Sequence, residues 1–382
     1  MIKVELETLS PLHVGNGREI TPIEYVVEGD NFYRVDVDGM LRDTKRFSRE
    51  RFLEFVEDAV STHRVPYLGD FERDLAKSHQ QYKLRILEKI NEVRPPRIKE
   101  YIKSSERFYI PGSSIKGAIL SALYWHLLKE SCKDYPGIEK IVKACLTKDY
   151  STLEGYQNTE YRRFIVTRWN SKYKRYEFQF AQILTNILFE SLIVEEERKR
   201  YIEERKGKRE REQITNNIKF APWLQVTDTV PIPASNACVS LCKVFGARRD
   251  ISVFYELLKP KSRLNFEMGV QKAGLGVHEI LEISDRFYQR VLEVEKKWCE
   301  KNRIFVSYGD VEDGYILRLG QGSTSLATSL IILSGDLGIE GEYLKSWKVA
   351  RYLTEPKTRK IVFEDGKPKY PLGWVRLEAK NE

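Results

Sequence analysis

Two glycine-rich segments of the chain precede stretches with helical periodicity, and both suit an anionic ligand. The first is Pro111-Gly112-Ser113-Ser114-Ile115-Lys116-Gly117, and the second is Leu317-Arg318-Leu319-Gly320-Gln321-Gly322-Ser323. Glycine lets another backbone approach closely, and the unpaired N–H groups in the first turn of a helix attract negative charge. We therefore expect a phosphate backbone to lie against both segments, in contact with Gly112, Ser113, Ser114, Lys116, Arg318, Gly320, Gln321, Gly322 and Ser323.

Neither segment is a nucleotide-binding fingerprint. No Gly-Lys-Ser or Gly-Lys-Thr closes a P-loop, and no G-x-G-x-x-G begins a strand-to-helix turn. ATP binding is therefore disfavoured. Lys116 falls in the first turn of its helix, with Ser113 or Ser114 as the expected N-cap. A cation there opposes the helix dipole unless an anion lies nearby, and the alternative is a side chain that points into water.

A third glycine-rich loop follows the first strand, in which Ile2, Val4 and Leu6 alternate with charged residues. Its sequence is Ser10-Pro11-Leu12-His13-Val14-Gly15-Asn16-Gly17. His13 is either a general acid or base toward a ribose hydroxyl, or a histidine that binds RNA or fixes the loop. The second interpretation is favoured because no other histidine is near it in the sequence. We expect an RNA-binding loop lined by His13, Gly15, Asn16 and Arg18.

Cations and aromatic residues are interleaved between Thr159 and Tyr176. The cations include Arg162, Arg163, Arg168, Lys172, Lys174 and Arg175, and the aromatic residues are Tyr161, Phe164, Trp169, Tyr173 and Tyr176. Cations for phosphates beside flat rings for unstacked bases are typical of single-stranded nucleic-acid binding. The alternative is an exposed hairpin or helix face that packs on the protein itself or on a partner. A second basic cluster contains the candidate RNA contacts Lys45 and Arg46, and its alternative is a solvated charged helix.

Cysteine usage and acidic residues offer little support for catalysis. The five cysteines are an odd number spread thinly over the chain, which indicates reduced thiols rather than disulfides. Cys238 and Cys242 fit a core strand. A partial zinc site from His126, Cys132 and Cys145 is the remaining metal hypothesis, and we expect no cofactor. Asp228 precedes a proline turn and is interpreted as a turn former rather than a catalytic acid.

The composition predicts a globular protein. The chain has 382 residues, 41% of them hydrophobic, and a net charge of +8. No stretch approaches the roughly 20 apolar residues of a membrane span, and the N-terminus lacks the apolar run of a secretion signal. We therefore expect a cytoplasmic protein with no membrane partner.

Local patterns predict an α+β fold built from split βαβ units. They indicate a hairpin within residues 20–40 and charged helices from about Arg42 to Val93. Residues 130–220 are expected to be mostly helical. The charged run at 195–212 within them is interpreted as a solvated helix or a mobile arm. Strands are expected at 223–228, 237–244, 266–270 and 315–319, and an amphipathic helix from Ile280 to Trp298. We assign two RNA-recognition-motif-like (ferredoxin-like) domains. These are 1–262, with helical insertions at about 42–107 and 130–220, and 263–382, which contains the glycine-rich loop.

Four stretches together resemble the RAMP superfamily of CRISPR-associated proteins. They are residues 10–17, Ile110-Pro111-Gly112-Ser113-Ser114-Ile115-Lys116-Gly117, Leu224-Gln225-Val226-Thr227-Asp228 and Pro371-Leu372-Gly373-Trp374-Val375. The likeness extends from end to end of the chain. It is greatest to the subunits that stand fifth in type III-A Csm effector complexes.

The resemblance implies an RNA-binding subunit that caps the filament of RAMP subunits at the 3′ part of the CRISPR RNA and supports RNA maturation in antiviral defence. Implied partners are the other Csm subunits, chiefly the backbone RAMP and small helical subunits, and host ribonucleases that trim the RNA. In the related subunit that cleaves target RNA, an acidic residue follows the first glycine motif. Here the stretch from Gly15 to Ile23 contains only Glu19, so we expect no cleavage. The alternative is a metal-independent, repeat-processing endoribonuclease that uses His13.

Overall fold

A computed structural model describes residues 1–192, 223–246, 251–271, 275–311, 314–328, 330–347 and 358–380. Its first sheet is antiparallel, and in spatial order its strands are β11 (Leu224–Val226), β14 (Arg263–Val270), β1 (Ile2–Thr8), β18 (Trp374–Lys380) and β15 (Tyr315–Arg318). In the first half of this arrangement, helix α4 (Gly112–Asp134) lies between β1 and β11 in the chain. In the second half, α10 (Val277–Lys301) lies between β14 and the pair β15 and β18. The order β11-β14-β1-β18, with one helix in each half, is a ferredoxin-like split βαβ arrangement. The predicted α+β fold class is confirmed.

The second sheet is mixed. In spatial order its strands are β2 (Gly15–Ile20), β6 (Ile98–Tyr101), β13 (Ser252–Leu258), β12 (Ala237–Phe245), β5 (Gln80–Ile86), β4 (Asn31–Val35) and β3 (Tyr25–Glu28). Strand β16 (Arg359–Glu364) pairs with β12 and with β17 (Lys367–Pro371). The β12–β5 and β13–β6 pairs are parallel. A short hairpin, β7 (Lys103–Ser104) and β8 (Arg107–Phe108), leads toward α4.

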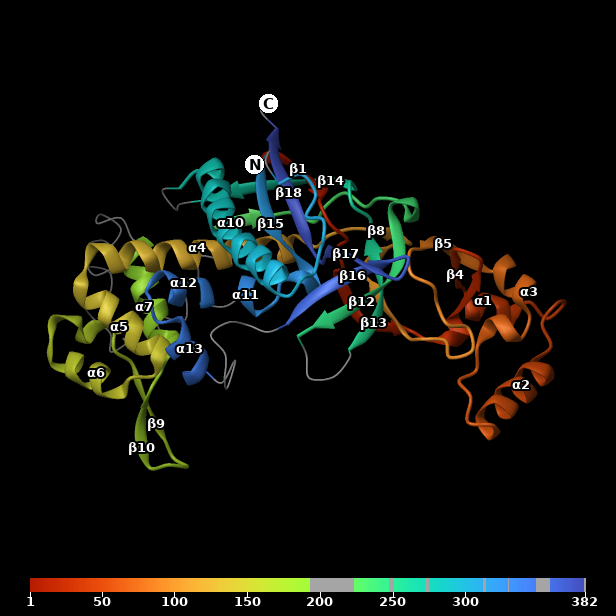
Figure 1. The fold of residues 1–382 in the computed structure, drawn as a ribbon, viewed down its shortest axis with the longest axis horizontal. Helices are drawn as coiled ribbons and strands as arrows, with labels where there is room; N and C mark the ends of the chain where they lie inside the picture. The colour runs from red at the N-terminus through yellow and green to blue at the C-terminus, as the bar shows by residue number, and fades with distance from the viewer. Residues whose placement is uncertain are drawn as a thin grey trace, which may run out of the picture.

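The remaining helices gather at the two ends of an elongated molecule. One end holds α1 (Val37–Arg42), α2 (Arg49–Ser61) and α3 (Arg73–Ser78), and the other surrounds α4 with α5 (Pro136–Thr147), α6 (Tyr150–Gly155), α7 (Phe180–Leu192), α11 (Ser325–Thr328), α12 (Ile331–Asp336) and α13 (Glu340–Ser346) (Figure 1). The hairpin β9 (Thr167–Asn170) and β10 (Arg175–Phe178) projects from this second group. Short 3₁₀ turns are η1 (Pro22–Glu24), η2 (Leu68–Asp70), η3 (Tyr156–Asn158), η4 (Glu160–Arg163), η5 (Ala234–Asn236) and η6 (Gly320–Gly322).

The periodic segments fold as their patterns predict. In α10, Ile280, Phe287 and Trp298 lie on the buried face, which packs against α4 and the first sheet. The hairpin predicted within residues 20–40 is β3 and β4, joined by Gly29 and Asp30. None of the helices in the described ranges combines the length and apolar character needed to cross a membrane.

The expectation for residues 42–93 needs correction. The stretch from Arg42 to Val93 is not helical throughout, because it contains β5. Tyr82, Leu84 and Ile86 are buried there and alternate with exposed charged residues, a period of two that the high charge content obscured. Residues 130–220 contain the β9–β10 hairpin as well as helices, and the charged run at 195–212 lies outside the described residues. Each sheet contains strands from both sides of residue 262.

Candidate nucleic-acid interface

The first glycine segment packs against the protein's own backbone. Pro111, not Ser113 or Ser114, is the N-cap of α4, and the amide of Gly112 donates to Oδ1 of Asp228 at 2.7 Å. A Cβ at Gly112 would lie 2.6 Å from the carbonyl oxygen of Thr227. The glycine therefore lets α4 begin against the chain that follows β11, and the Asp228 carboxylate already occupies the helix start. A phosphate contact at the Gly112 amide is therefore not supported, because that amide already donates to a carboxylate.

The second glycine segment joins three parts of the chain. Gly320 has φ +60°, and a Cβ on it would overlap the carbonyl oxygen of His13, while a Cβ on Gly322 would overlap that of Leu372. The amide of Gln321 donates to the His13 carbonyl at 2.9 Å, and Ser323 Oγ donates to the Arg318 carbonyl at 2.7 Å. Gly320 and Gly322 thus permit close backbone packing, and the predicted RNA contacts at these glycines and at Ser323 are not supported. The Gln321 side chain remains exposed.

Arg318 is a core residue. Its side chain is 0% exposed and forms an ion pair with Glu295 of α10, which is also 0% exposed. Its Nη2 donates to Glu295 Oε1 at 2.9 Å, and its Cζ lies 5.3 Å from the ring centroid of Trp374. The prediction that Arg318 contacts RNA is therefore wrong. The signal was present in the sequence, since Arg318 lies between apolar residues of a strand that is buried along most of its length.

His13 fixes the loop that follows β1. Its ring is 2% exposed, and Nδ1 lies 2.8 Å from the carbonyl oxygen of Glu256. Burial, followed by the positive charges of Lys360, Lys103 and Lys99, lowers the pKa of His13 from 6.5 to about 4. The ring is neutral at physiological pH and shielded from solvent, so the predicted RNA contact of the His13 side chain is not supported. A Cβ on Gly15 would lie 2.7 Å from His13 Nε2, so the glycine makes room for the ring.

This buried neutral histidine predicts a specific dependence of stability on pH. The unfolded chain takes up the proton near pH 6.5 and the folded chain only near pH 4, so the stabilisation is complete above pH 6.5 and is lost as the pH falls toward 4. Between pH 7 and pH 5 the unsubstituted protein should lose about 2 kcal/mol of unfolding free energy relative to His13→Gln. Urea unfolding of both proteins at the two pH values measures this. A stability difference that does not change with pH would contradict it.

The residues after His13 form an exposed bulge. Gly15 is opposite Tyr101 and Glu19 is opposite Lys99, with a register shift between the two pairs. Gly17 has φ +87° and open space around it, and the Arg18 side chain is 76% exposed. Asn16 Nδ2 donates to Glu100 Oε2 at 3.0 Å, and its Oδ1 accepts from the Arg18 amide at 2.8 Å. The structure therefore presents Asn16, Gly17 and Arg18 at the surface, and small residues there leave the backbone accessible.

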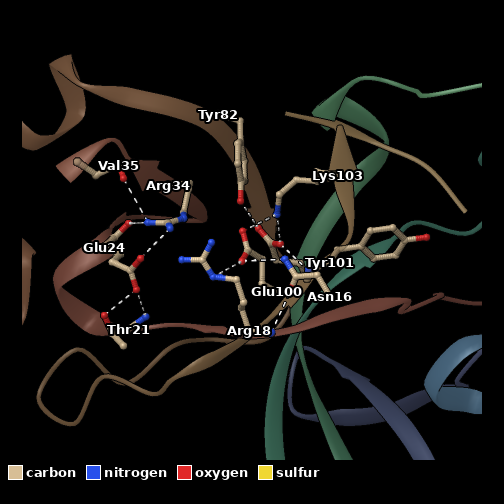
Figure 2. Close-up of polar contacts among 11 residues, drawn as sticks. Asn16, Arg18, Thr21, Glu24, Arg34, Val35, Tyr82, Glu100, Tyr101 and Lys103 are labelled. Carbon is tan, nitrogen blue, oxygen red and sulfur yellow. Dashed lines mark hydrogen bonds and ion pairs between the residues drawn. The ribbon is translucent and has the colours of Figure 1, made fainter. Parts of the chain in front are cut away.

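The buried carboxylate of Glu256 stabilises the strand that pairs with this bulge. Glu256 of β13 is 0% exposed and accepts from Tyr82 Oη at 2.7 Å, from the Tyr101 amide at 2.9 Å and from Lys103 Nζ at 2.5 Å. Lys103 Nζ also lies 3.4 Å from Glu100 Oε1. Figure 2 shows Tyr82, Tyr101 and Lys103 converging in this network next to Asn16 and Arg18. The network fixes β6 under the bulge, because an unpaired buried carboxylate is very unfavourable.

Cations from distant parts of the chain lie near His13, just before the bulge. Lys360 of β16 and Lys99 of β6 are close enough to His13 to lower its pKa. Lys360 Nζ donates to Gln321 Oε1 at 2.8 Å, and Lys99 Nζ lies 2.6 Å from Glu19 Oε1. Burial also lowers the pKa of Lys360. Sequence reasoning missed Lys99, Lys103, Lys360 and Glu256. Of these four, only Glu256 could have been found from the sequence, because it is a charged residue in the apolar run of β13.

The other predicted residues lie elsewhere. Lys45 and Arg46 are exposed in the turn between α1 and α2, at one end of the molecule. Arg162 and Arg163 are exposed in η4, and Arg168 is exposed on β9, at the other end. Ser113 is exposed and Lys116 is half-buried in the first turns of α4. Lys45 and Arg46 therefore lie at the opposite end of the molecule from Arg162, Arg163 and Arg168.

No metal centre is assembled among the described residues. Groups of three or more His, Cys, Asp or Glu side chains with suitable geometry are absent there, so His126, Cys132 and Cys145 do not form a zinc site. The cysteines are free and buried, and burial raises the pKa values of Cys132 and Cys145 to about 12. The Asp228 carboxylate accepts a hydrogen bond from the Gly112 amide at the start of α4.

Comparisons with known proteins agree with this arrangement. Residues 5–317 match the family model described as the RAMP superfamily. The "CRISPR system Cms protein Csm5" of Methanocaldococcus jannaschii is 24% identical over 200 residues, which are 46% of this chain and 48% of that protein. The chain thus matches about half the length of this curated relative.

Two solved structures share the fold. A chain in the "Cryo-EM structure of Csm-crRNA-target RNA ternary complex in type III-A CRISPR-Cas system" has a TM-score of 0.66 and 23% identity, with 99% of this chain and 100% of that chain covered. The "Crystal structure of T.onnurineus Csm5" has a TM-score of 0.57 and 19% identity, with 97% and 99% covered. At these identities the likeness shows a common fold.

Proposed function

The chain belongs to the RAMP superfamily, and from that premise we propose that it is an RNA-binding subunit of a type III-A CRISPR effector complex. The observation that carries the proposal is the exposed bulge at Asn16, Gly17 and Arg18, with Lys99 on the adjacent strand and Lys360 near His13. Cations position a ribose-phosphate strand, and side-chain amides such as those of Asn16 and Gln321 hydrogen-bond ribose or bases.

The partners follow from the relatives' names. One relative is called Csm5, and another is a chain in a complex of Csm proteins with CRISPR RNA and target RNA. We propose that this chain binds the 3′ part of the CRISPR RNA at the end of the RAMP backbone, beside other Csm subunits. In this proposal it supports RNA maturation while host ribonucleases trim the RNA, and it acts in the cytoplasm.

We propose further that the chain is not itself a ribonuclease. His13 is neutral near physiological pH, so it lacks the imidazolium proton of a general acid, and at 2% exposure it has no open path to a ribose hydroxyl. Holding the RNA is then the contribution of this subunit, and chemistry on the RNA belongs to other proteins.

Incubation of the purified chain with CRISPR repeat RNA in EDTA tests this assignment. We expect the RNA to be bound but not cut, and we expect His13→Ala to behave in the same way. Discrete products that disappear in His13→Ala would establish the metal-independent endoribonuclease instead. Co-expression with the other subunits, followed by sequencing of the bound RNA, identifies which part of the CRISPR RNA this chain protects. The proposal predicts the 3′ part.

A further inference from the structure

The β9–β10 hairpin carries two large aromatic side chains in contact with each other and with solvent. Trp169 and Tyr176 are directly opposite in the strand register, and their ring centroids are 5.1 Å apart at 65°. Trp169 is 51% exposed and Tyr176 is 68% exposed. The hairpin projects from the helical end of the molecule, away from both sheets (Figure 1). An aromatic pair this exposed is unusual for a surface that has no partner.

The hairpin is held in shape at both ends. At its base, Phe178 is 8% exposed with its ring centroid 6.1 Å from that of Tyr150, and the Gln179 amide donates to the Val166 carbonyl at 2.9 Å. At its tip, Asn170 Oδ1 accepts from the Lys172 amide at 3.0 Å. The Asn170 Nδ2 atom donates to Glu177 Oε2 at 2.8 Å. The exposed rings therefore stand on a preformed scaffold, which reduces the entropy lost when a ligand binds.

The surroundings of the pair are cationic. Arg168, Lys172 and Lys174 are exposed within the hairpin, and Arg162 is exposed just before it. The acidic residues of the same stretch are Glu160 and Glu177, and Glu177 is hydrogen-bonded to Asn170. Cores of protein–protein interfaces are depleted of lysine. A single-stranded nucleic acid fits this surface better than a protein does. Its bases can stack on the flat rings, and its phosphates can bind the neighbouring lysine and arginine side chains.

We propose that the Trp169–Tyr176 pair is a stacking platform for single-stranded RNA, with Arg168, Lys172 and Lys174 binding its phosphates. The inference rests on the proposed function and extends it, because it gives the RNA a second point of contact at the helical end of the chain. Sequence is not read at this point, because every base offers a flat face to the rings.

The test compares binding of a fluorescein-labelled, single-stranded 20-nucleotide RNA and of the same RNA as a duplex to the full-length chain, by fluorescence anisotropy. The variant is Trp169→Ala/Tyr176→Ala, and the matched control is Phe305→Ala, which removes an 84% exposed ring elsewhere. We expect the double variant to bind the single strand roughly tenfold more weakly or worse. Duplex binding should not change, because base faces are hidden inside a helix. Thermal unfolding of each variant verifies the fold.

Each outcome decides between the two proposals. Unchanged single-strand affinity in the double variant, or an equal loss with duplex, would overturn the stacking platform, as would a double variant that binds RNA normally but no longer assembles with other subunits. The proposed function is tested separately by Arg18→Ala/Lys99→Ala/Lys360→Ala. If only these charge substitutions weaken RNA binding, the bulge stands and the platform falls. If only the aromatic substitutions weaken RNA binding, the platform stands and the bulge falls.

Discussion

Replacing Arg318 by alanine is expected to lower the free energy of unfolding by about 3–5 kcal/mol, because it leaves the carboxylate of Glu295 buried without a cation. Both side chains are 0% exposed, and the pair joins α10 to β15 in the core of the first sheet. Arg318 Nε also donates to the Leu372 carbonyl at 3.3 Å, next to the glycine-rich turn. Urea-induced unfolding of the variant and the unsubstituted chain measures the difference.

Two further proteins separate the buried ion pair from the general effect of losing an arginine. Arg64→Ala breaks an exposed pair, in which the two side chains are each 64% exposed, and should change the stability by no more than about 1 kcal/mol. Arg318→Met/Glu295→Leu removes both charges and should recover most of the lost stability. If Arg318→Ala were as mild as Arg64→Ala, Arg318 would not be the core residue that the structure describes.

The triple variant Arg18→Ala/Lys99→Ala/Lys360→Ala is expected to bind single-stranded RNA roughly 100-fold more weakly at about 0.1 M salt, on the basis of three lost phosphate contacts. Arg18 is 76% exposed and Lys99 is 42% exposed, so their removal should leave the core intact. The control variant Lys133→Ala/Arg263→Ala/Lys380→Ala removes the same charge from side chains that are 60%, 65% and 49% exposed. It should bind RNA nearly as well as the unsubstituted chain. Equal losses in both variants would show that total charge, rather than the bulge, determines affinity.

Sequence patterns predicted the elements whose stability is local. The spacing of apolar residues correctly predicted the buried faces of α10 and β1. The turn residues Gly29 and Asp30 correctly predicted the β3–β4 hairpin. β5 was missed because its charged residues fall on the exposed face of a strand, where they are also compatible with a helix. Sheet membership was not predictable, because β1 pairs with β14 and β18 across more than 200 residues of intervening chain.

The glycines show why the site was predicted only in part. A glycine that admits a phosphate and a glycine that admits a neighbouring backbone have the same local sequence. For Gly112 and Gly322 the neighbours are Thr227 and Leu372, which come from remote segments. Asn16 and Arg18 are exposed, as expected for a loop of small and polar residues after a strand. Lys99 and Lys360 were missed because only long-range strand pairing, of β6 with β2 and of β16 with β12, brings them near His13.

The salt dependence of RNA affinity tests the central claim most directly, because each phosphate contact contributes to the slope of log Kd against log salt concentration. The measurement compares the unsubstituted chain, the triple variant at Arg18, Lys99 and Lys360, and the control variant at Lys133, Arg263 and Lys380. We predict that the slope of the triple variant falls by about 2, since each contact to a single strand contributes roughly 0.7, while the control keeps the original slope. An unchanged slope in the triple variant would contradict the account, because the bulge would then not hold the RNA backbone.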